Sequence, residues 1–495
     1  MTIMHPVHTI PHTQKRVLVI GGGISGLAAA HYLQQRGIKV RVLEKNHRPG
    51  GLIQSERVAG FLLEHAATCL FNFLPEVDLF CQNLGLNGEQ LFRQEAARRR
   101  YLIRDGRPVP VPMSVGGFVQ SNLISLPGKL RLLLEPFIPR GPGDGDQETV
   151  AQFVTRRLGR EMYERAIEPY VSGTLAGDGE RACLRSTFSQ LAALEQEHGS
   201  LLKGMIWRKL AGIRTSGCGA RVFSFRQGMA AMAQAVARQL GADFMPGHTV
   251  TSLMRQGPVW QVTSVDDQHR GLTHAADAVL VATPAQDAAG LLESLSQPLG
   301  RLLRGITYAP MVIVHLGFAR QDLVHPLDGI GCLVPRCEAG WELLGSLWSS
   351  TLFADRAPAG QVLLMNYLGG SRHPEAGEWT DQALIERSMA DLRRMVGVRG
   401  TPSLARVIRH ARALPGYQLG HPLFLRGLDE QLALLPGIFL AGNYLRGVSV
   451  RACISQGEQA AAQITHLLSV QETVAGVREP SRPPVGVWGQ GPRGR

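Results

Sequence analysis

The sequence predicts a protein of mixed α/β and α+β class, whose Rossmann-like nucleotide-binding domain is assembled from three separate segments of the chain. Three observations predict this class. A strand, a glycine turn and a helix follow one another within residues 15–51. Strand patterns of the same kind recur in the middle of the chain and near its end. The stretches between them have the periodicities of a mixed sheet and of short helices, which we interpret as insertions.

The first unit contains a glycine-rich turn between a strand and a helix. Residues 17–20 are an apolar run suited to a buried parallel strand, and residues 27–35 are compatible with a helix. Between them, Gly21, Gly23 and Gly26 follow the pattern Gly-x-Gly-x-x-Gly, in which a tight turn, a close pyrophosphate and close helix–strand packing all exclude a Cβ. The helix N-terminus offers free N–H groups to phosphate oxygens. The unit predicts a dinucleotide site formed by Gly21, Gly22, Gly23, Ile24, Ser25 and Gly26.

An acidic residue and a second glycine pair indicate which dinucleotide binds. Glu44 follows a second strand, residues 39–43, and lies 18 residues after Gly26, where a carboxylate can accept from a ribose hydroxyl. An acid there argues against a 2′-phosphate, so NADP is the weakest candidate. The Arg-Pro-Gly-Gly of residues 48–51 can bring the backbone under a second phosphate or a flavin, although a surface turn is the alternative. FAD is therefore preferred to NAD, with contacts expected from Lys45, Arg48, Gly50 and Gly51.

Composition and charge restrict the partners. At 495 residues, with 44% hydrophobic and 19% charged residues, the chain can form two or three folded domains. Its formal net charge of +12 is almost entirely due to arginine, and no lysine follows Lys209. A basic surface favours anionic partners, namely phospholipid headgroups, nucleic acid or a substrate that carries carboxylates. No nucleic-acid partner is expected, since no helix-turn-helix, zinc-finger or RNA-recognition pattern is found.

The cysteines and the apolar runs restrict the compartment. Seven scattered cysteines include no Cys-x-x-Cys pair, so neither a metal site nor a disulfide framework is indicated, which suits a reducing compartment. Residues 1–16 lack the apolar core of a signal peptide. The longest apolar stretches, such as residues 306–319, are shorter than the about 18 residues that a membrane span needs. We expect a protein that is soluble or bound to one face of a membrane.

The middle of the chain changes its pattern twice. Residues 90–140 carry a basic run and then an apolar stretch that proline and glycine interrupt, and residues 148–210 have helical spacing. A helix and a short strand after residue 223 resemble the first unit again, and residues 278–282 predict another buried strand. Two insertions therefore separate pieces of one nucleotide-binding domain.

The last part of the chain contains a sheet, two helices and a tail. Residues 305–370 alternate as β-strands do, and residues 379–397 predict an amphipathic helix. Residues 438–441 predict a strand, and residues 450–467 a helix whose N-terminus is a positive dipole end. We assign the FAD-binding domain to residues 1–85, 220–304 and 412–470, a helical domain to 86–211, a mixed-sheet substrate domain to 305–411, and a disordered tail to 477–495.

Six segments of the sequence resemble those of a known protein family. They are GGGISGLAAAHYL (21–33), ARRRYLIRDGRPVPVP (97–112), GKLRLLLEPFIPRG (128–141), YVSGTLAGD (170–178), LPGYQLGH (414–421) and AGNYLRGVSVRACISQGEQAA (441–461). Over about residues 15–464, the chain resembles the flavin monoamine oxidase superfamily, and within it the oxygen-dependent protoporphyrinogen oxidase family of haem synthesis. The first phrase is shared by all such flavoproteins, whereas LPGYQLGH and the last phrase are more particular.

The resemblance implies where the cofactor and the substrate bind. Further FAD contacts are implied at Leu52, Val250, Asn443, Val448, Ser449 and Val450. A tetrapyrrole cavity is implied at Gly173, Ile330, Leu333 and Tyr367, with Arg100 near a propionate. The helical domain would bind a membrane surface, so that a cytoplasmic protein lies on the inner face of the cell membrane.

The implied reaction oxidises protoporphyrinogen IX to protoporphyrin IX, with dioxygen as the acceptor. Flavin N5 takes a hydride from a meso carbon while pyrrole N–H protons leave, so the cofactor performs the hard step and no catalytic side chain is expected. Coproporphyrinogen III stays open as an alternative substrate, because two or four carboxylates could meet the same basic rim. A homodimer and a contact with ferrochelatase are also left open.

Several features keep other interpretations open. Arg100 could belong to a solvated or lipid-facing run, and Leu333 and Tyr367 could be ordinary core residues of a sheet. The phrase EHAAT at 64–68 replaces the family's usual Glu-x-Gly-Pro-Arg, which leaves room for a flavin-fold scaffold without activity. An amine oxidase is disfavoured because no lysine follows Lys209, and a carotenoid desaturase because it would not need LPGYQLGH.

Overall fold

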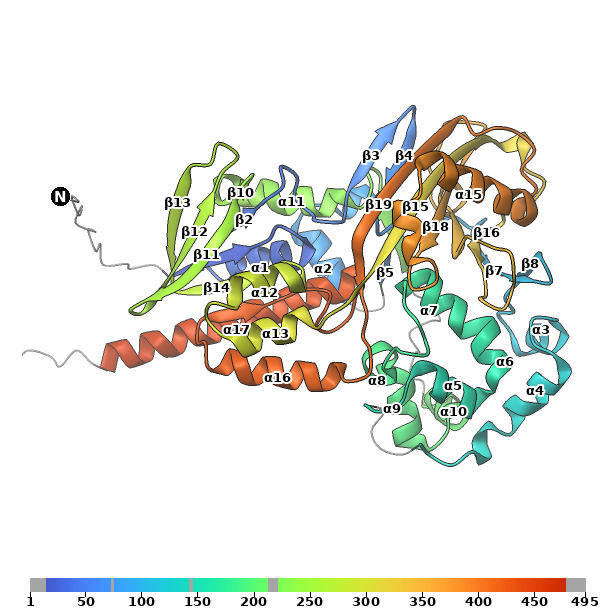
Figure 1. The fold of residues 1–495 in the computed structure, drawn as a ribbon, viewed down its shortest axis with the longest axis horizontal. Coiled ribbons are helices and arrows are strands. Elements are labelled where there is room, and N and C mark those ends of the chain that lie inside the picture. The colour runs from blue at the N-terminus through green and yellow to red at the C-terminus, as the bar shows by residue number, and fades with distance from the viewer. Residues whose placement is uncertain (1–14, 73–74, 142–145, 212–220, 478–495) are drawn as a thin grey trace, which may run out of the picture.

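The computed structural model describes residues 15–72, 75–141, 146–211 and 221–477. The predicted tail, residues 477–495, lies outside the described residues except for Val477, and so do most of residues 1–16. Figure 1 shows three regions: a parallel sheet between helices on the left, a mixed sheet at the upper right, and a group of short helices at the lower right.

A five-stranded parallel sheet draws its strands from three distant parts of the chain. The order is β10-β2-β1-β14-β20, and every pairing is parallel. Runs of valine, leucine and isoleucine suit strands that are buried on both faces. This sheet confirms the Rossmann-like unit and the strands that the sequence predicted in it. The strands are β1 (Arg16–Ile20), β2 (Lys39–Glu44), β10 (Phe244–Pro246), β14 (Ala278–Val281) and β20 (Ile438–Leu440).

Helices cover both faces of the parallel sheet. On one face, α1 (Ile24–Gln35), α11 (Ala230–Leu240) and α17 (Val450–Val477) enclose one apolar core. The predicted helix at 450–467 is thus confirmed and extends ten residues further. The other face packs on helices and a small antiparallel sheet, which are α12 (Ala285–Leu292), α13 (Gln297–Arg304), α16 (His421–Ala433), β11 (Thr249–Gln256), β12 (Val259–Val265) and β13 (Gly271–Ala276).

A seven-stranded mixed sheet forms the second region, in the order β19-β15-β18-β17-β16-β7-β8. The predicted amphipathic helix at 379–397 is confirmed as α15 (Asp381–Val396), and it packs on one face of this sheet. Thr380 caps the start of this helix, since its side chain accepts from the N–H of Ala383, and Gly397 ends it with a φ of +67°. The strands are β7 (Arg99–Arg104), β8 (Arg107–Pro110), β15 (Tyr308–Ala319), β16 (Gly329–Leu333), β17 (Gly345–Trp348), β18 (Gln361–Gly369) and β19 (Leu404–Pro415).

The start of the predicted helical domain differs from expectation. Residues 99–110 form the hairpin β7–β8, and β7 pairs in parallel with β16 of the mixed sheet. The turn is Asp105-Gly106, with φ values of +50° and +75°, a two-residue loop that Asp-Gly favours. The α-helices of the segment 86–211 therefore begin only after this hairpin, which belongs to the sheet of the second region.

The third region consists of short helices, and it confirms the helical spacing seen at 148–210. Two small β-elements lie among the regions. The hairpin β3 (Ser55–Val58) and β4 (Phe61–Glu64) lies between the parallel-sheet region and the mixed sheet (Figure 1), and β5 (Leu70–Asn72), β9 (Arg221–Phe225) and β6 (Gln90–Phe92) form a separate three-stranded sheet. The helix α2 (Pro75–Asn83) follows β5. The helices of this region are α3 (Val115–Gln120), α4 (Leu126–Leu133), α5 (Val150–Leu158), α6 (Arg160–Met162), α7 (Glu168–Leu175), α8 (Leu184–Thr187), α9 (Ser189–His198) and α10 (Leu201–Leu210).

Candidate active site

The first glycine turn joins β1 to α1, and its three glycines have different surroundings. A Cβ at Gly21 would lie 2.7 Å from the Ala282 carbonyl oxygen, and one at Gly26 would lie 2.2 Å from the Gly21 carbonyl oxygen. These two glycines are required by packing. A Cβ at Gly23, by contrast, would meet no atom within 4 Å, and no side chain caps the N-terminus of α1 there. Gly23 therefore leaves free space in front of uncapped N–H groups, where a phosphate fits.

The carboxylate of Glu44 is fixed beside this turn at the end of β2. It is buried, and its Oε2 accepts from the backbone N–H of Gly22 at 2.6 Å. Its Oε1 accepts from the backbone and side-chain nitrogens of Asn46, at 2.8 and 2.6 Å. Val250 lies nearby on β11, since the N–H of His248 donates to the Glu44 carbonyl at 2.9 Å. Glu44 is thus held next to the turn, as expected of an acid that binds a ribose.

The second glycine turn lies directly against the first. The N–H of Gly50 donates to the Gly22 carbonyl at 2.7 Å, and Gly50 and Gly51 have φ values of +109° and +61°. A Cβ at Gly51 would lie 3.4 Å from the Gly23 Cα. Arg48, just before them, is exposed and has no hydrogen-bond or ion-pair partner among the described residues. Two neighbouring residues were also predicted to contact FAD. Leu52 is exposed, whereas the Lys45 ammonium forms an ion pair with Asp287 at 3.5 Å.

The loop between β20 and α17 comes to the same place from the end of the chain. Gly457 of α17 packs against α1, because a Cβ there would lie 2.6 Å from the Ser25 carbonyl. Tyr417, in the LPGYQLGH segment, donates from Oη to the Asn443 carbonyl at 2.5 Å and accepts from the Gly447 N–H at 2.8 Å. Ser449 Oγ accepts from a backbone N–H in the first turn of α17, and Val448 and Val450 flank it, both half-buried.

The predicted cofactor residues therefore come from four parts of the chain and meet around one turn. Two polar atoms there have no partner although they are buried: Thr283 Oγ1, whose side chain would touch a Cβ at Gly21, and Gln456 Oε1 of α17. Unpartnered buried polar atoms are uncommon in proteins. The free space at Gly23, the fixed acid and these two atoms fit a dinucleotide at this turn.

The mixed sheet has a second, separate face that does not pack on α15. Alternate residues such as Cys332 point to the α15 core. In the register of β7, β16, β17 and β18, Leu102 pairs with Leu333, Leu333 with Gly345, and Gly345 with Tyr367. Because side chains alternate along a strand, this row lies on the face opposite α15, which we call the substrate face. The structure thus brings the predicted residues Leu333 and Tyr367 together.

Arg100 lies on the same face, at its edge. It is two residues before Leu102 on β7, is exposed, and has no hydrogen-bond or ion-pair partner for its guanidinium among the described residues. Its neighbours differ: Arg98 pairs with Glu95, and Arg99 pairs with Asp328, both at 2.7 Å. Within the basic run, Arg100 is therefore the arginine available to an anionic ligand of the substrate face.

Gly173 and Ile330 complete the set of predicted substrate residues. A Cβ at Gly173 of α7 would lie 2.7 Å from Leu333 Cδ2, so α7 lies close over the substrate face. The register of β16 with β7 is irregular between Gly329 and Cys332, and Ile330 packs against the same buried cluster, which includes Leu352 and Phe353, as Leu347 does. The registers and contacts connect all five predicted residues to one face.

Other residues of this face could not be chosen from the sequence. Ile313, Met365 and Leu347 pack around Tyr367, and burial raises the pKa of the Cys69 thiol to about 11. Nothing marks these residues in the sequence, since an apolar residue of a strand gives no sign of which face it occupies. The altered segment at 64–68 meets this face at His315, whose Nε2 lies 2.9 Å from the Glu64 carbonyl oxygen.

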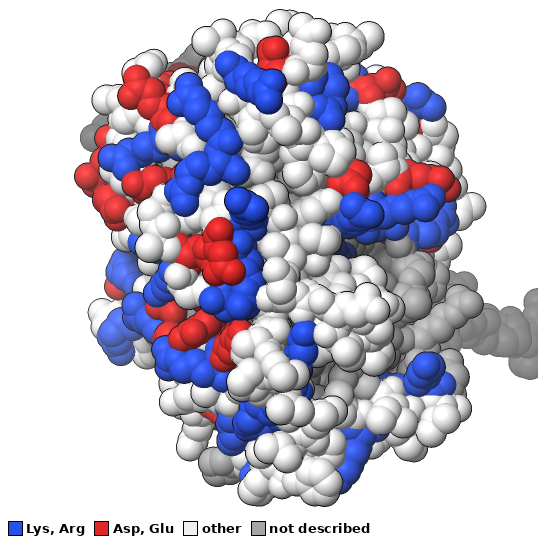
Figure 2. Space-filling model, turned by 90° about the vertical axis from the view of Figure 1, so that its right-hand side faces the viewer, with Lys and Arg blue, Asp and Glu red and all other residues white. Residues whose placement is uncertain are grey.

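A separate exposed apolar surface covers the helical region. Phe137 is 82% exposed and Leu210 is 83% exposed, although both are large apolar residues. In Figure 2 the lower part of this side of the molecule is mostly white, with some blue and little red. In the part of the chain that the structure describes, no helix is both long and apolar enough to cross a membrane. The apolar surface consists of Val115, Val119, Leu126, Leu130, Leu133, Leu134, Phe137, Met205, Ile206, Trp207 and Leu210.

Comparison with known families assigns the chain to a class. Residues 24–465 match the family described as flavin containing amine oxidoreductase, and the chain belongs to this family. The resemblance seen in the sequence is thereby confirmed, and a flavin is the cofactor that the family implies.

Individual relatives cover nearly the whole chain. The mitochondrial protoporphyrinogen oxidase of Nicotiana tabacum is 31% identical over 484 residues, which cover 92% of this chain and 96% of that protein. The coproporphyrinogen III oxidase of Bacillus subtilis (strain 168) is 29% identical over 481 residues, which cover 92% and 99%. A solved structure from Exiguobacterium sp. 255-15, provisionally named a protoporphyrinogen oxidase, is 23% identical with a TM-score of 0.77, over 93% and 99%; it shows the same fold.

Proposed function

We propose that this protein is an FAD-dependent porphyrinogen oxidase of haem synthesis, which converts protoporphyrinogen IX to protoporphyrin IX with dioxygen as the acceptor. The observation that carries the proposal is the substrate face: an apolar sheet surface with an unpaired arginine, Arg100, at its edge. A porphyrinogen is apolar across its rings and anionic at its propionates, so its chemistry matches this surface. Relatives named for porphyrinogen oxidation match nine-tenths of the chain and support the choice.

Different residues would bind the cofactor and the substrate. Gly23 and Gly51 would admit the FAD pyrophosphate to the α1 N-terminus, and Glu44 would hold a ribose hydroxyl. When bound, FAD supplies the ring that accepts a hydride from a meso carbon. Leu333 and Tyr367 would exclude water from the porphyrinogen, and Arg100 would bind a propionate through charge-assisted hydrogen bonds.

Coproporphyrinogen III is the second candidate substrate. The Bacillus subtilis relative named for it matches this chain over a similar length and at a similar identity to the plant relative. An assay with both compounds distinguishes them: the purified protein is mixed with each porphyrinogen under air, and porphyrin fluorescence is followed. The proposal expects faster oxidation of protoporphyrinogen IX, and preference for coproporphyrinogen III would replace the substrate while keeping the chemistry.

We propose that the exposed apolar surface of α3, α4 and α10 binds the inner face of the cell membrane. Trp207 and Phe137 are residues of types that insert at the level of lipid headgroups, and the basic residues Arg208 and Lys209 follow Trp207 at the end of α10. The protein should sediment with anionic vesicles at physiological salt. Recovery of nearly all of it in the supernatant would contradict this part of the proposal.

The alternatives from the sequence are weaker. An amine oxidase of the same family would be expected to place a lysine near flavin N5 in the later half of the chain, and no lysine follows Lys209. A desaturase has no need of the LPGYQLGH segment, in which Tyr417 holds the loop before α17. A scaffold without activity is excluded if the purified protein oxidises either porphyrinogen.

A further inference from the structure

A buried carboxyl lies at the end of the substrate face, in the segment that departs from the family pattern. Glu64, the last residue of β4, is 3% exposed. Its Oε2 accepts from Ser55 Oγ at 2.6 Å, and its Oε1 accepts from the backbone N–H of Met229 at 2.9 Å. Arg356 Nη2 lies 3.8 Å from the same Oε1, too far for a hydrogen bond, and Arg356 Nη1 has no partner.

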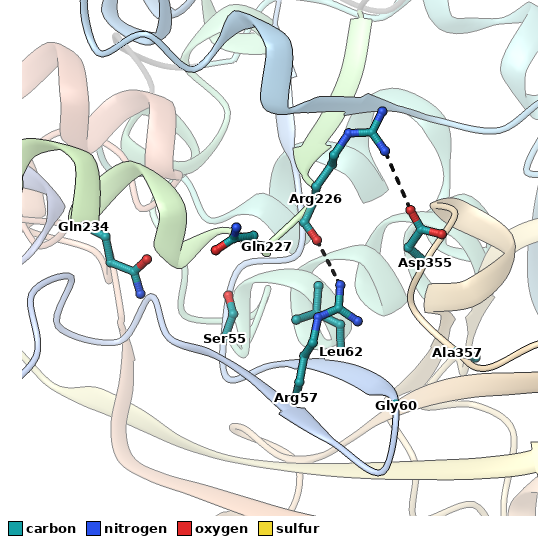
Figure 3. A pocket seen from close by; sticks show the side chains of 9 residues that line it. All are labelled: Ser55, Arg57, Gly60, Leu62, Arg226, Gln227, Gln234, Asp355 and Ala357. Atoms are coloured by element: carbon teal, nitrogen blue, oxygen red, sulfur yellow. Dashed lines mark hydrogen bonds and ion pairs between the residues drawn. The ribbon is translucent and has the colours of Figure 1, made fainter.

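The serine that donates to Glu64 also reaches a pocket at the surface. The pocket has a volume of about 770 Å³, and Ser55 lines it together with Arg57, Arg226 and Gln227. Figure 3 shows these side chains around the pocket, with Arg226 paired to Asp355 at its far side. The Ser55 hydroxyl therefore has the buried carboxyl on one side and the pocket on the other.

The sheet register places Glu64 near Tyr367. His315 Nε2 lies 2.9 Å from the Glu64 carbonyl oxygen, and His315 pairs with Met365. Ile313, two residues earlier on β15, pairs with Tyr367. Because positions two apart point to the same face, the His315–Met365 pair lies about 7 Å along the strand from the Ile313–Tyr367 pair, on the same face. Besides burial, the charge of the Glu64 carboxylate contributes to raising the pKa of Tyr367. The Tyr367 hydroxyl points toward this end, since its Oη lies 3.3 Å from Met365 Sδ.

Glu64 differs from its neighbours in the pH range over which it changes charge. Burial raises the pKa of its carboxyl to about 7, although the Ser55 hydrogen bond, the Arg356 guanidinium and the Met229 N–H each lower it. Burial raises the pKa of Tyr367 as well, and lowers the pKa of His315 to about 4. The other ionisable groups that face this place are His65, whose pKa burial lowers, Cys69, whose pKa burial raises to about 11, and Arg356 itself.

We propose that Glu64 is a proton-relay residue: it takes up the proton that a pyrrole nitrogen of the porphyrinogen loses, and it returns this proton to solvent through Ser55 and the surface pocket. This inference rests on the proposed function. The Glu64 backbone meets the substrate face at His315, and the charge of its carboxylate acts on Tyr367, so the relay would run to Glu64 through the Tyr367 hydroxyl.

The step balances as follows. One meso C–H bond would break, and its electron pair would leave with the hydrogen as hydride to the flavin that the proposed function places at the glycine turns. One pyrrole N–H bond breaks, its electron pair stays in the ring system as part of the new double bonds, and its proton passes to the Tyr367 hydroxyl as that hydroxyl gives its own proton to the Glu64 carboxylate. Glu64 then protonates Ser55 as the Ser55 proton leaves into the pocket, which restores the carboxylate for the next turnover.

The test compares the holoenzyme with four variants, of which Glu64→Asp is the conservative replacement. Glu64→Gln removes the proton acceptor, Ser55→Ala removes the exit, and Ser224→Ala is the control, because Ser224 Oγ accepts from Arg356 Nη2 but not from Glu64. The measured quantities are flavin content, KM, and kcat for porphyrin formation across pH. In parallel, infrared spectra of the wild type and Glu64→Gln follow the protonated-carboxyl absorption during a pH titration.

We expect the kcat of the wild type to rise with pH through about 7, because the carboxylate form accepts the proton. Glu64→Gln should lose this rising limb and about a hundredfold in kcat, with KM changed less than about twofold and flavin content kept. Ser55→Ala should lower kcat by about tenfold, as its exit path is removed. Glu64→Asp should restore part of the limb, and the infrared band that titrates near neutral pH should be absent from Glu64→Gln.

The possible results distinguish a failure of the proposed function from a failure of the Glu64 relay. If the wild type oxidises neither porphyrinogen, the proposed function and the relay both fail. If the wild type is active and Glu64→Gln keeps the rising limb, the relay alone is wrong. Should Glu64→Gln lose its flavin, Ser55→Ala decides, and a pH profile of Ser55→Ala identical in height and shape to that of Ser224→Ala overturns the relay.

Discussion

Separate replacement of Gly26 and Gly23 by alanine distinguishes the packing glycine of the first turn from the one proposed to admit a ligand. A Cβ at Gly26 would lie 2.2 Å from the Gly21 carbonyl oxygen and 3.1 Å from Ala282 Cβ, far inside ordinary contact at 3.4 Å. Overpacking of this kind costs about 1–3 kcal/mol, against which the better helix propensity of alanine returns at most about 1 kcal/mol. Gly26→Ala should therefore lower the free energy of unfolding by about 1–2 kcal/mol.

Gly23→Ala should instead leave the free energy of unfolding nearly unchanged and weaken the binding of FAD. Its Cβ would meet no atom within 4 Å, and the φ of −69° at this position suits any residue. The weaker N-cap and the stiffer unfolded chain offset each other, so stability should stay within about 0.5 kcal/mol of the wild type. The added methyl group would stand where the pyrophosphate is proposed, and we expect the Kd for FAD to rise at least about tenfold, or about 1.4 kcal/mol.

Two measurements check this pair of predictions. Urea unfolding of the flavin-free protein gives the free energies of unfolding, and titration with FAD, followed by flavin fluorescence, gives the Kd. If Gly23→Ala binds FAD as tightly as the wild type, the pyrophosphate does not lie at this turn. If Gly26→Ala is as stable as the wild type, the steric argument for the turn is wrong.

Three further predictions concern Arg100, the exposed apolar surface and the buried Glu64. Arg100→Ala should raise the KM for the porphyrinogen about tenfold or more, through loss of a charge-assisted hydrogen bond, and leave flavin content unchanged. Phe137→Glu should shift the protein from vesicles to the supernatant in a sedimentation assay, because a charge then replaces an apolar side chain at the proposed membrane surface. Burial raises the Glu64 pKa from 4.5 to about 7, so this group favours folding fully below pH 4.5, and its contribution is lost as pH rises through about 7. Glu64→Gln should abolish that loss of about 3 kcal/mol in the free energy of unfolding.

Matched controls exist for these variants. Arg99→Ala should leave the KM for the porphyrinogen unchanged, since Arg99 pairs with Asp328 on the other side of β7. If Arg99→Ala and Arg100→Ala raise the KM equally, Arg100 is not the residue that binds the propionate. Leu434→Glu is the control for Phe137→Glu, because Leu434 is 72% exposed but lies outside the apolar surface; it should leave vesicle binding unchanged. Parallel curves of unfolding free energy against pH for the wild type and Glu64→Gln would show that Glu64 is not the titrating group.

The parallel sheet could be predicted because its signals are local. An apolar strand, a glycine turn and an acid at a fixed spacing specify the first unit, and similar runs mark β14 and β20. The hairpin β7–β8 was not predicted, although Asp105-Gly106 is a strong turn signal. The surrounding arginines and prolines were interpreted as part of a membrane-binding region, and the pairing of β7 with β16 joins residues more than two hundred positions apart.

The site could be predicted only in part, for the same reason. The cofactor turn rests on neighbouring residues, so its glycines and Glu44 could be named. The substrate face depends on which strands pair and in which register, and Arg100, Leu333 and Tyr367 were chosen by resemblance alone. Glu64 could not be recognised as a buried acid, because its burial depends on Met229 and Arg356 from distant segments.

The central claim is that the two glycine turns hold FAD next to the substrate face, and one measurement tests it most directly. The purified protein is denatured, the released cofactor is identified by mass, and its amount is compared with that of the chain. The account predicts close to one FAD for each chain, released from a yellow protein that forms fluorescent porphyrin from protoporphyrinogen IX under air. A colourless protein that takes up no FAD when the cofactor is supplied would contradict it.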